Sequence, residues 1–469
     1  MIFGLLAPTL IAIICALLLL SLLAPAQAKD SFPIMLRVFI SMGMGLGISS
    51  CLLFLCLVFS PLSKNTLVIS ELSLIATLII CLYLKLRACP GKMIDLRAAR
   101  LPTKRRADLF ISVSFFITLT LSLMAFILLV GTNPHGEWDA IAIWNLKARF
   151  IFRSGINWEM VFSNHIAHPD YPLLIPLSIV RLWTYVGKET AIVPPLISGL
   201  FVFGTVGLLV TGITIAKGRR QEYLGGMVLL AIPFFFKLGT FLYADVPYAF
   251  YLLATIILLH IYGRPAGKES SFLIMAGITA SLAAWTKNEE LLFMVAIIVV
   301  FLITRVLWRK PVAKEITLFM LGSLPVTSVI IYFKMAFAVE NDLISGVNPG
   351  HILARLTDLS RYMTILDFFV KRIIDFGDWN ILPLVLFVYL IFMVFFMPRD
   401  NYTEAVFPAL TVIVMAAGYF FVYVAFSPYD LLWHLNTSLE RLIIQLTPII
   451  LFTYFLIIPN TSKFLAAKK

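Results

Sequence analysis

Long apolar runs, separated by short polar segments, make up most of the chain. Within each run the apolar residues are continuous, whereas the strands of a membrane β-barrel would alternate apolar and polar positions. The pattern therefore predicts an all-α polytopic membrane protein. Because each helical crossing needs roughly 20 residues, we expect about 13 transmembrane helices. They begin near Ile2, Ile34, Thr66, Asp108, Thr190, Tyr223, Val246, Ser270, Leu291, Ile316, Ile381, Glu404 and Leu442.

One apolar run, residues 171–187, does not fit a crossing. It is short for a span, contains Pro172 and Pro176, and carries Arg181. We expect this run to form a juxtamembrane helix that lies on the outer leaflet. Residues 132–189 then form one large external loop.

The composition is that of a membrane protein and excludes a soluble globular enzyme. Of the 469 residues, 61% are hydrophobic and 13% are charged, and the mean hydropathy is +0.96. The formal net charge is +12, but the basic residues lie mostly in short loops between apolar runs. Such loops stay in the cytosol and orient the helices, so the charge indicates topology and not a nucleic-acid partner.

The densest basic segment, residues 85–107, fixes the orientation. When this segment is placed in the cytosol, the other basic loops fall on the same side and most acidic residues fall outside. The three longer external segments are 132–189, 340–380 and 427–441. We divide the chain into three N-terminal helices with the basic loop (1–107), a central core (108–338) and the C-terminal helices (339–469).

Two carboxylates open the first external loop, in Gly136-Glu137-Trp138-Asp139. They follow a predicted span directly and so lie at the membrane surface. A carboxylate held there near cations could stay ionised and accept the proton of an acceptor hydroxyl beside a lipid-anchored leaving group. The alternative is an ordinary solvated beginning of a loop.

Three basic residues follow in the same loop: Lys147, Arg149 and Arg153. Helical spacing puts Arg149 and Arg153 on one face, with Lys147 nearby. Aromatic and aliphatic residues interleave with them. The segment could bind lipid phosphates, or its basic side chains could simply extend to the lipid headgroups.

The next motif is His168-Pro169-Asp170-Tyr171-Pro172, which follows His165 by three residues. A His-x-x-His-x-Asp spacing can indicate a metal site. The prolines on both sides of Asp170 instead favour a rigid extended turn. We therefore interpret the motif as a pocket wall and assign no metal ligand.

Other polar residues stand where spans begin or end on the external side. Asp245 starts a helix in Asp245-Val246-Pro247, where an aspartate is also a common N-cap. Lys287-Asn288-Glu289-Glu290 lies at the tip of a helical hairpin, and four polar residues there are costly unless used or paired. His434 and Arg441 flank the last span on the same side.

Taken in order, these motifs resemble the GT-C superfamily of membrane glycosyltransferases, and more narrowly the bacterial enzymes related to aminoarabinose transferase and the protein O-mannosyltransferases. The motifs are Glu137-Trp138-Asp139, Trp144-x-x-Lys147-Ala148-Arg149, His168-Pro169-Asp170-Tyr171-Pro172, Ala244-Asp245-Val246-Pro247 and Trp285-Thr286-Lys287-Asn288-Glu289. The likeness covers roughly residues 108–308, with a looser match from Trp433 to Arg441.

The resemblance implies a bacterial inner-membrane transferase whose site faces the periplasm or exterior. It would take a sugar from a polyprenyl-phosphate-linked donor and pass it to a lipid, glycan or protein acceptor. Asp139, or else Glu137, would be the base, and Asp245 would be a second acidic site residue. The donor phosphate would be bound by Lys147, Arg149, Lys287 and Arg441. The substrate pocket would be lined by His168, Asp170, Tyr171, Asn288, Glu289 and His434.

We predict inversion at the anomeric carbon, because a single displacement inverts that centre. The sequence requires no cofactor, and a divalent metal, which some relatives need, is not favoured.

Two other functions stay open. A polytopic transporter or lipid flippase would concentrate charges near the bilayer midplane, whereas most charges here lie at one interface. Lys237 and Lys334 lie within spans, but both are close enough to a helix end to extend to the headgroups. A glycan ligase or polymerase shares the helical body but would have one dominant late loop rather than several charged tips.

Overall fold

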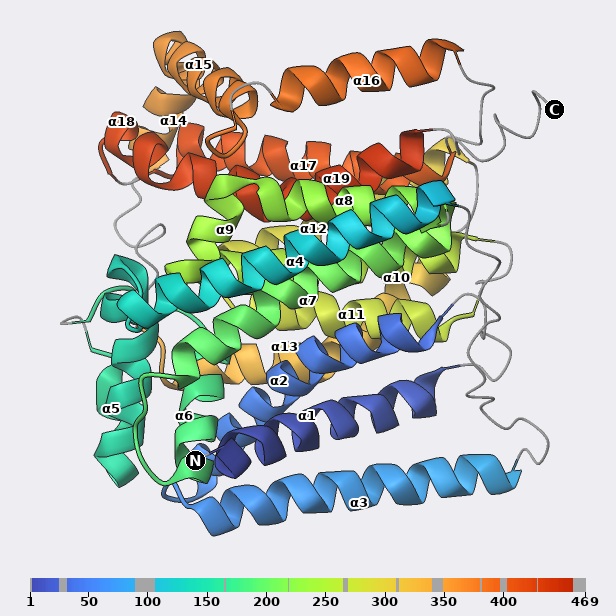
Figure 1. Ribbon diagram of the computed structural model, residues 1–469. Helices are drawn as coiled ribbons and strands as arrows, with labels where there is room; N and C mark the ends of the chain where they lie inside the picture. The colour runs from blue at the N-terminus through green and yellow to red at the C-terminus, as the bar shows by residue number, and fades with distance from the viewer. Residues whose placement is uncertain are drawn as a thin grey trace.

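Helices form the whole regular structure of the described chain. The computed structural model describes residues 2–24, 32–88, 106–163, 166–217, 219–264, 269–308, 312–339, 349–379, 382–396, 403–427 and 429–458. No strand occurs within these ranges, which confirms the prediction of an all-α chain for the described residues. The long helices run roughly side by side as one bundle (Figure 1).

The helices of the bundle are α1 (Ile2–Leu23), α2 (Ile34–Phe59), α3 (Lys64–Ala88), α4 (Arg106–Thr132), α7 (Val193–Lys217), α8 (Arg219–Ala231), α9 (Pro233–Thr240), α10 (Asp245–Gly263), α11 (Ser271–Ala284), α12 (Leu291–Leu307), α13 (Ala313–Ala336), α16 (Leu382–Phe396), α17 (Thr403–Ala425) and α19 (Glu440–Ile457). The remaining α-helices are α5 (Leu146–Ser154), α6 (Leu174–Val186), α14 (Pro349–Thr357), α15 (Leu359–Asp375) and α18 (Leu431–His434). Two π-helical turns, η1 (Ala140–Asn145) and η5 (Leu435–Leu439), and two 3₁₀ turns, η2 (Gly155–Val161) and η4 (Asn288–Glu290), complete the order.

Nine helical stretches among the described residues are long and apolar enough to cross a membrane. The last of them runs through α18, η5 and α19. The other four predicted spans coincide with the pair α8/α9, which is bent by 64°, and with the shorter apolar helices α11, α12 and α16. Length and composition thus define an integral membrane protein, and the figure of about 13 crossings stays a prediction.

Different chain segments gather at the two ends of the bundle (Figure 1). The short helices α5 and α6 lie across one end, beside the end of α4 and the beginning of α7, and we call this the α5/α6 end. Helices α3, α7, α10 and α12 all terminate at the opposite end. The basic residues near those four termini, Lys85, Arg87, Lys217, Arg264 and Arg305, therefore share one end of the molecule.

Helix α6 corresponds to the run that was expected to lie on the outer leaflet. Its 13 residues are too few for a crossing, as expected. The helix does not rest on lipid, however, because its residues are almost all buried among α1, α2, α5 and α7. Arg181, which suggested a surface position, has a side chain that is 1% exposed. The expectation of an exposed interfacial helix is therefore wrong.

A buried ion pair explains how Arg181 is accommodated inside the protein. Its Nε lies 2.6 Å from Glu71 Oε1, and its Nη2 donates to Glu71 Oε2 at 3.0 Å and to the carbonyl of Pro8 at 2.8 Å. Tyr185 OH donates to Glu71 Oε2 at 2.6 Å. These contacts join α1 and α3 to α6, so two of the three N-terminal helices are connected to the central core by polar contacts as well as by apolar packing.

Helices α11 and α13 pack with their backbones in close contact. A Cβ at Gly277 of α11 would collide with the carbonyl of Phe319, and a Cβ at Gly322 of α13 would collide with the carbonyl of Ile274. Small residues let membrane helices approach in this way. The contact fixes α11 against α13, and both helices end where Lys287 and Lys334 lie.

Candidate functional site

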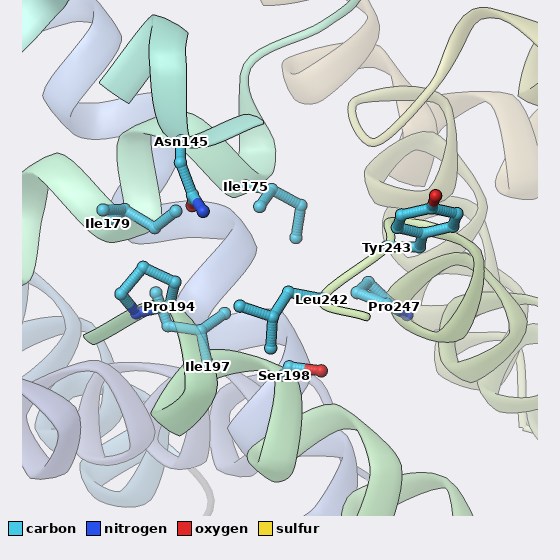
Figure 2. Close-up of a pocket in the computed structure, with 9 residues that line it drawn as sticks. All are labelled: Asn145, Ile175, Ile179, Pro194, Ile197, Ser198, Leu242, Tyr243 and Pro247. Carbon is cyan, nitrogen blue, oxygen red and sulfur yellow. The ribbon is translucent and has the colours of Figure 1, made fainter. Parts of the chain in front are cut away.

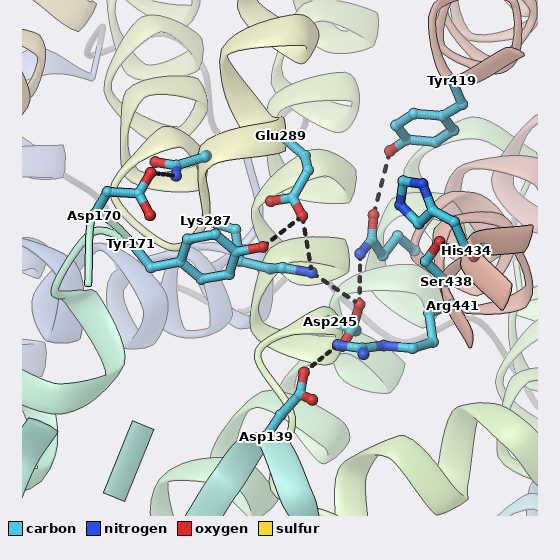
Figure 3. A network of polar contacts seen from close by, with 12 residues as sticks. Asp139, Asp170, Tyr171, Asp245, Lys287, Glu289, Tyr419, His434, Ser438 and Arg441 are labelled. Atoms are coloured by element: carbon cyan, nitrogen blue, oxygen red, sulfur yellow. Dashed lines mark hydrogen bonds and ion pairs between the residues drawn. The ribbon is translucent and has the colours of Figure 1, made fainter. Parts of the chain in front are cut away.

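Four charged side chains from distant parts of the sequence meet at the α5/α6 end (Figure 3). Arg441 Nη2 lies 2.5 Å from Asp139 Oδ2 and 2.8 Å from Asp245 Oδ2. Lys287 Nζ lies 3.3 Å from Asp245 Oδ1. We call Asp139, Asp245, Lys287 and Arg441 the charged cluster. It joins the first predicted external loop to α10, to the segment after α11 and to α19.

Asp245 is the most enclosed member of the charged cluster, with 1% of its side chain exposed. Arg441 donates to its Oδ2 through Nε at 3.2 Å as well as through Nη2. Gln445 Nε2 donates to Oδ1 at 2.5 Å, and Lys287 is the third donor. A buried carboxylate needs partners of this kind, because an unpaired buried charge is very unfavourable. Gln445 follows Arg441 by one helical turn, so both side chains reach the same carboxylate.

A backbone contact places Asp139 beside Asp245. Gly136 has a φ of +71°, which favours glycine, and a Cβ there would collide with the carbonyl of Phe241. The N–H of Glu137 donates to the same carbonyl at 3.2 Å. The start of the first predicted external loop is thereby attached to the turn that leads into α10.

The two π-helical turns of the described chain adjoin the two partners of one ion pair. Turn η1 begins directly after Asp139, and η5 ends two residues before Arg441. A π turn holds one residue more than an α turn and therefore rotates the side chains that follow, and such turns are frequent at functional sites. The two π turns thus set the orientation of Asp139 relative to α5 and that of Arg441 relative to α18.

Glu289 forms the neighbouring part of the site. Its Oε1 accepts a hydrogen bond from Tyr171 OH at 3.0 Å and lies 3.9 Å from Lys287 Nζ. Its Oε2 is buried and has no hydrogen-bond partner among the described residues. Burial alone would raise the pKa of Glu289, but the charge of Lys287 and the hydrogen bonds to the carboxylate outweigh it and lower the pKa. The lowered pKa favours the ionised form of Glu289.

Asp170, Asn288 and Lys334 form a second group next to Glu289. Asn288 Nδ2 donates to Asp170 Oδ2. Lys334 Nζ lies 2.5 Å from both of its acceptors, Asn288 Oδ1 and the carbonyl oxygen of Asp170. Lys334 therefore does not extend to the headgroups, contrary to expectation, because polar partners from two other segments meet its ammonium. The other lysine within a predicted span is Lys237, and its Nζ lies 5.6 Å from the centre of the Phe241 ring.

Three of the residues predicted as the base or as ligands of the donor phosphate lie outside the charged cluster. Glu137 is exposed and accepts a hydrogen bond from Asn133 Nδ2 at 3.2 Å. Arg149 contacts His135 Nδ1 at 3.2 Å. Lys147 is fully buried, and its Nζ donates to the carbonyls of His168 at 2.5 Å and Tyr171 at 3.4 Å. Its ammonium fixes the 168–171 turn.

Lys147 should make stability depend on pH. Burial lowers the pKa of Lys147 from 10.5 to about 7, with a further lowering by Lys334 and an opposing effect of Asp170. Between pH 7 and 10.5 the unfolded chain then binds one proton more than the folded chain, so stability rises with pH, by at most about 1.4 kcal/mol per unit. We expect Lys147→Met to flatten this slope in melting temperatures measured from pH 6.5 to 9.5.

The matched control for Lys147→Met is Lys188→Met, which removes an exposed lysine. It should leave the pH dependence of the melting temperature unchanged. An identical slope in the wild type and in Lys147→Met would contradict the assignment.

The two histidines predicted for the substrate pocket pack against tyrosine rings. The ring of His168 stacks on that of Tyr171, with a centroid distance of 4.6 Å. His434 Nδ1 contacts Ser427 Oγ at 2.8 Å, and its ring packs against that of Tyr423. His165 lies outside the described residues. Within the described ranges no three His, Cys, Asp or Glu side chains are grouped as metal ligands would be.

A small hollow lies beside Tyr243 (Figure 2). Its volume is about 280 Å³, including space that opens to solvent. Tyr243 separates it from the charged cluster, since the Arg441 guanidinium lies 4.6 Å from the centre of the Tyr243 ring. The lining is mostly apolar and consists of Asn145, Ile175, Ile179, Pro194, Ile197, Ser198, Leu242, Tyr243 and Pro247.

Three residues contact the site although they were not predicted to belong to it: Gln445, Lys334 and Tyr243. Gln445 and Lys334 are polar residues inside apolar helices, which by itself suggests a function in a membrane protein. Tyr243 gave no such indication, because a tyrosine before a helix start is common at membrane interfaces.

Comparisons with known proteins found no matching family model, curated protein or solved structure. The fold and site themselves define an all-helical membrane protein in which a charged cluster lies at one end of the bundle.

Proposed function

We propose that this protein is an inverting glycosyltransferase that moves a sugar from a polyprenyl-phosphate-linked donor to an acceptor at the external face of a bacterial inner membrane. The observation that carries the proposal is the bridge that Arg441 makes between Asp139 and Asp245, with Lys287 beside it. It places a carboxylate suited to proton abstraction within 2.5 Å of a guanidinium suited to phosphate binding.

The transfer divides into two tasks that different residues perform. The acceptor hydroxyl gives its proton to Asp139 as its oxygen bonds to the anomeric carbon. The bond from that carbon to the phosphate oxygen breaks at the same time, and Arg441 and Lys287 neutralise the leaving phosphate. One displacement inverts the anomeric centre. The position of Glu137 outside the charged cluster favours Asp139 over Glu137 as base.

The distribution of charge supports the proposed orientation. The charged cluster lies at the α5/α6 end, and the basic helix termini lie at the other end, which the charge rule for membrane proteins puts in the cytosol. About 13 crossings and a GT-C-like arrangement are part of the same proposal. The partners are the lipid-linked donor, a lipid, glycan or protein acceptor, and membrane lipids, with no nucleic acid. No cofactor is invoked.

The functional test is Asp139→Asn in purified protein. An amide cannot accept the acceptor proton, so we expect transfer from a polyprenyl-phosphate sugar to fall by about 100-fold or more. The control is Glu189→Gln, which breaks an exposed carboxylate–arginine pair with Arg153 and should keep wild-type transfer. Near-full activity of Asp139→Asn would overturn the role of Asp139 as base.

The same assay separates the alternative functions. Mass spectrometry of lipids that copurify with the protein identifies the donor, and analysis of the product shows whether one sugar or a whole glycan has moved. A transporter or flippase would move the lipid-linked sugar across vesicles without breaking its bond to phosphate. A ligase or polymerase would transfer the entire glycan.

A further inference from the structure

The charged cluster contains no surplus positive charge for a phosphate. Asp139 and Asp245 balance Arg441 and Lys287. A lipid phosphate therefore gains a strong contact with Arg441 only if it replaces one of the two carboxylates as the guanidinium's partner. The burial and the hydrogen bonds of the two carboxylates indicate which of them is replaced.

The two carboxylates are held very differently. Asp245 is 1% exposed and takes hydrogen bonds from Arg441, Gln445 and Lys287. Asp139 is 12% exposed, and the only side-chain hydrogen bond of its carboxylate among the described residues is the one from Arg441 Nη2. Arg441 itself is 19% exposed, so this contact lies at the accessible edge of the cluster. Asp139 is the replaceable partner, and Asp245 holds the guanidinium in place.

Resting on the proposed function, we propose that the donor phosphate displaces Asp139 from Arg441, and that this exchange releases the base only when the donor is bound. In the free protein Arg441 Nη2 donates to Oδ2 of the carboxylate that has to accept the proton, so the guanidinium occupies the place of the acceptor hydroxyl. The phosphate, which matches the guanidinium fork in two contacts, takes the place of Asp139. The acceptor cannot be deprotonated before the donor has arrived.

The exchange also closes the reaction cycle. The acceptor proton passes to Asp139, the new carbon–oxygen bond forms, and the electron pair of the broken bond stays on the phosphate oxygen, which Arg441 neutralises. Asp139 is then a neutral acid and no longer competes for Arg441. Loss of its proton to water and departure of the polyprenyl phosphate restore the ion pair of the free protein.

The test measures binding of a polyprenyl monophosphate that carries no sugar, so that no transfer is possible. Asp139→Asn removes the competing charge, and we expect it to bind the monophosphate about tenfold more tightly than the wild type, the effect of one charge-assisted hydrogen bond. The control Glu189→Gln should bind as the wild type does. Asp139→Ser carries the same expectation and serves if the asparagine variant is unstable.

Equal or weaker binding by the neutral variants would overturn the exchange, even if the wild type is active and the proposed function holds. Tighter binding with no detectable transfer by the wild type would support the exchange of phosphate for Asp139 and count against the glycosyltransferase. The two proposals can therefore fail separately.

Discussion

Arg441→Met is expected to abolish sugar transfer and to destabilise the protein at once. The guanidinium is the common partner of Asp139 and Asp245, and its removal leaves a buried carboxylate with reduced compensation. Breaking a buried ion pair from one side costs about 3–5 kcal/mol. The loss of a group that neutralises the leaving phosphate adds a decrease of about 10²- to 10³-fold in kcat. Thermal unfolding in detergent and the transfer assay measure the two effects separately.

The matched variant is Arg441→Lys. It keeps the positive charge, but a single ammonium does not reproduce the planar fork that contacts both carboxylates. We expect much of the stability to return and most of the activity to stay lost. Transfer by Arg441→Met within a few-fold of the wild type would remove Arg441 from the proposed site.

Glu71→Leu is expected to have the largest effect on stability outside the site. Arg181 would keep its charge in a position that is 1% exposed and would lose its carboxylate partner. The expected loss is about 3–5 kcal/mol of unfolding free energy. It should appear as a lower melting temperature, because the contacts of Glu71 join α3 to α6 and, through Arg181, to α1.

A second substitution tests whether charge causes that loss. In Glu71→Leu/Arg181→Met both charges are replaced by apolar groups, a change that is often neutral in buried pairs, so most of the stability should return. Asp367→Asn breaks the exposed pair with Lys371 and should change stability by less than about 1 kcal/mol. Wild-type melting of Glu71→Leu alone would show that apolar packing is sufficient to hold α3.

The sequence was sufficient to predict the helical class and much of the charged cluster. Charges are rare in so apolar a chain, and those at the external ends of predicted spans have few places to go except toward one another. This reasoning selected Asp139, Asp245, Lys287 and Arg441, which the structure brings together.

The remaining features depend on contacts between distant parts of the chain, which the spacing of residues along the sequence does not predict. Lys147 was expected at the donor phosphate, but its ammonium meets backbone carbonyls of a turn that begins 21 residues later. Arg181 suggested a surface helix, but its ion-pair partner is Glu71, which lies 110 residues earlier in the sequence. Lys334 was missed for the same reason, because its partners come from two other parts of the chain.

The π turns make the position of Arg441 a matter of chain length as well as residue type. An α-helix turns about 100° per residue, so an uninterrupted α-helix with the same number of residues in place of η5 would point Arg441 to a different side. The same holds for η1, which adjoins Asp139. At these two places the loss of one residue would convert the π turn into an α turn and keep the pair together, so sequence alignments of this region have to allow a gap of one residue.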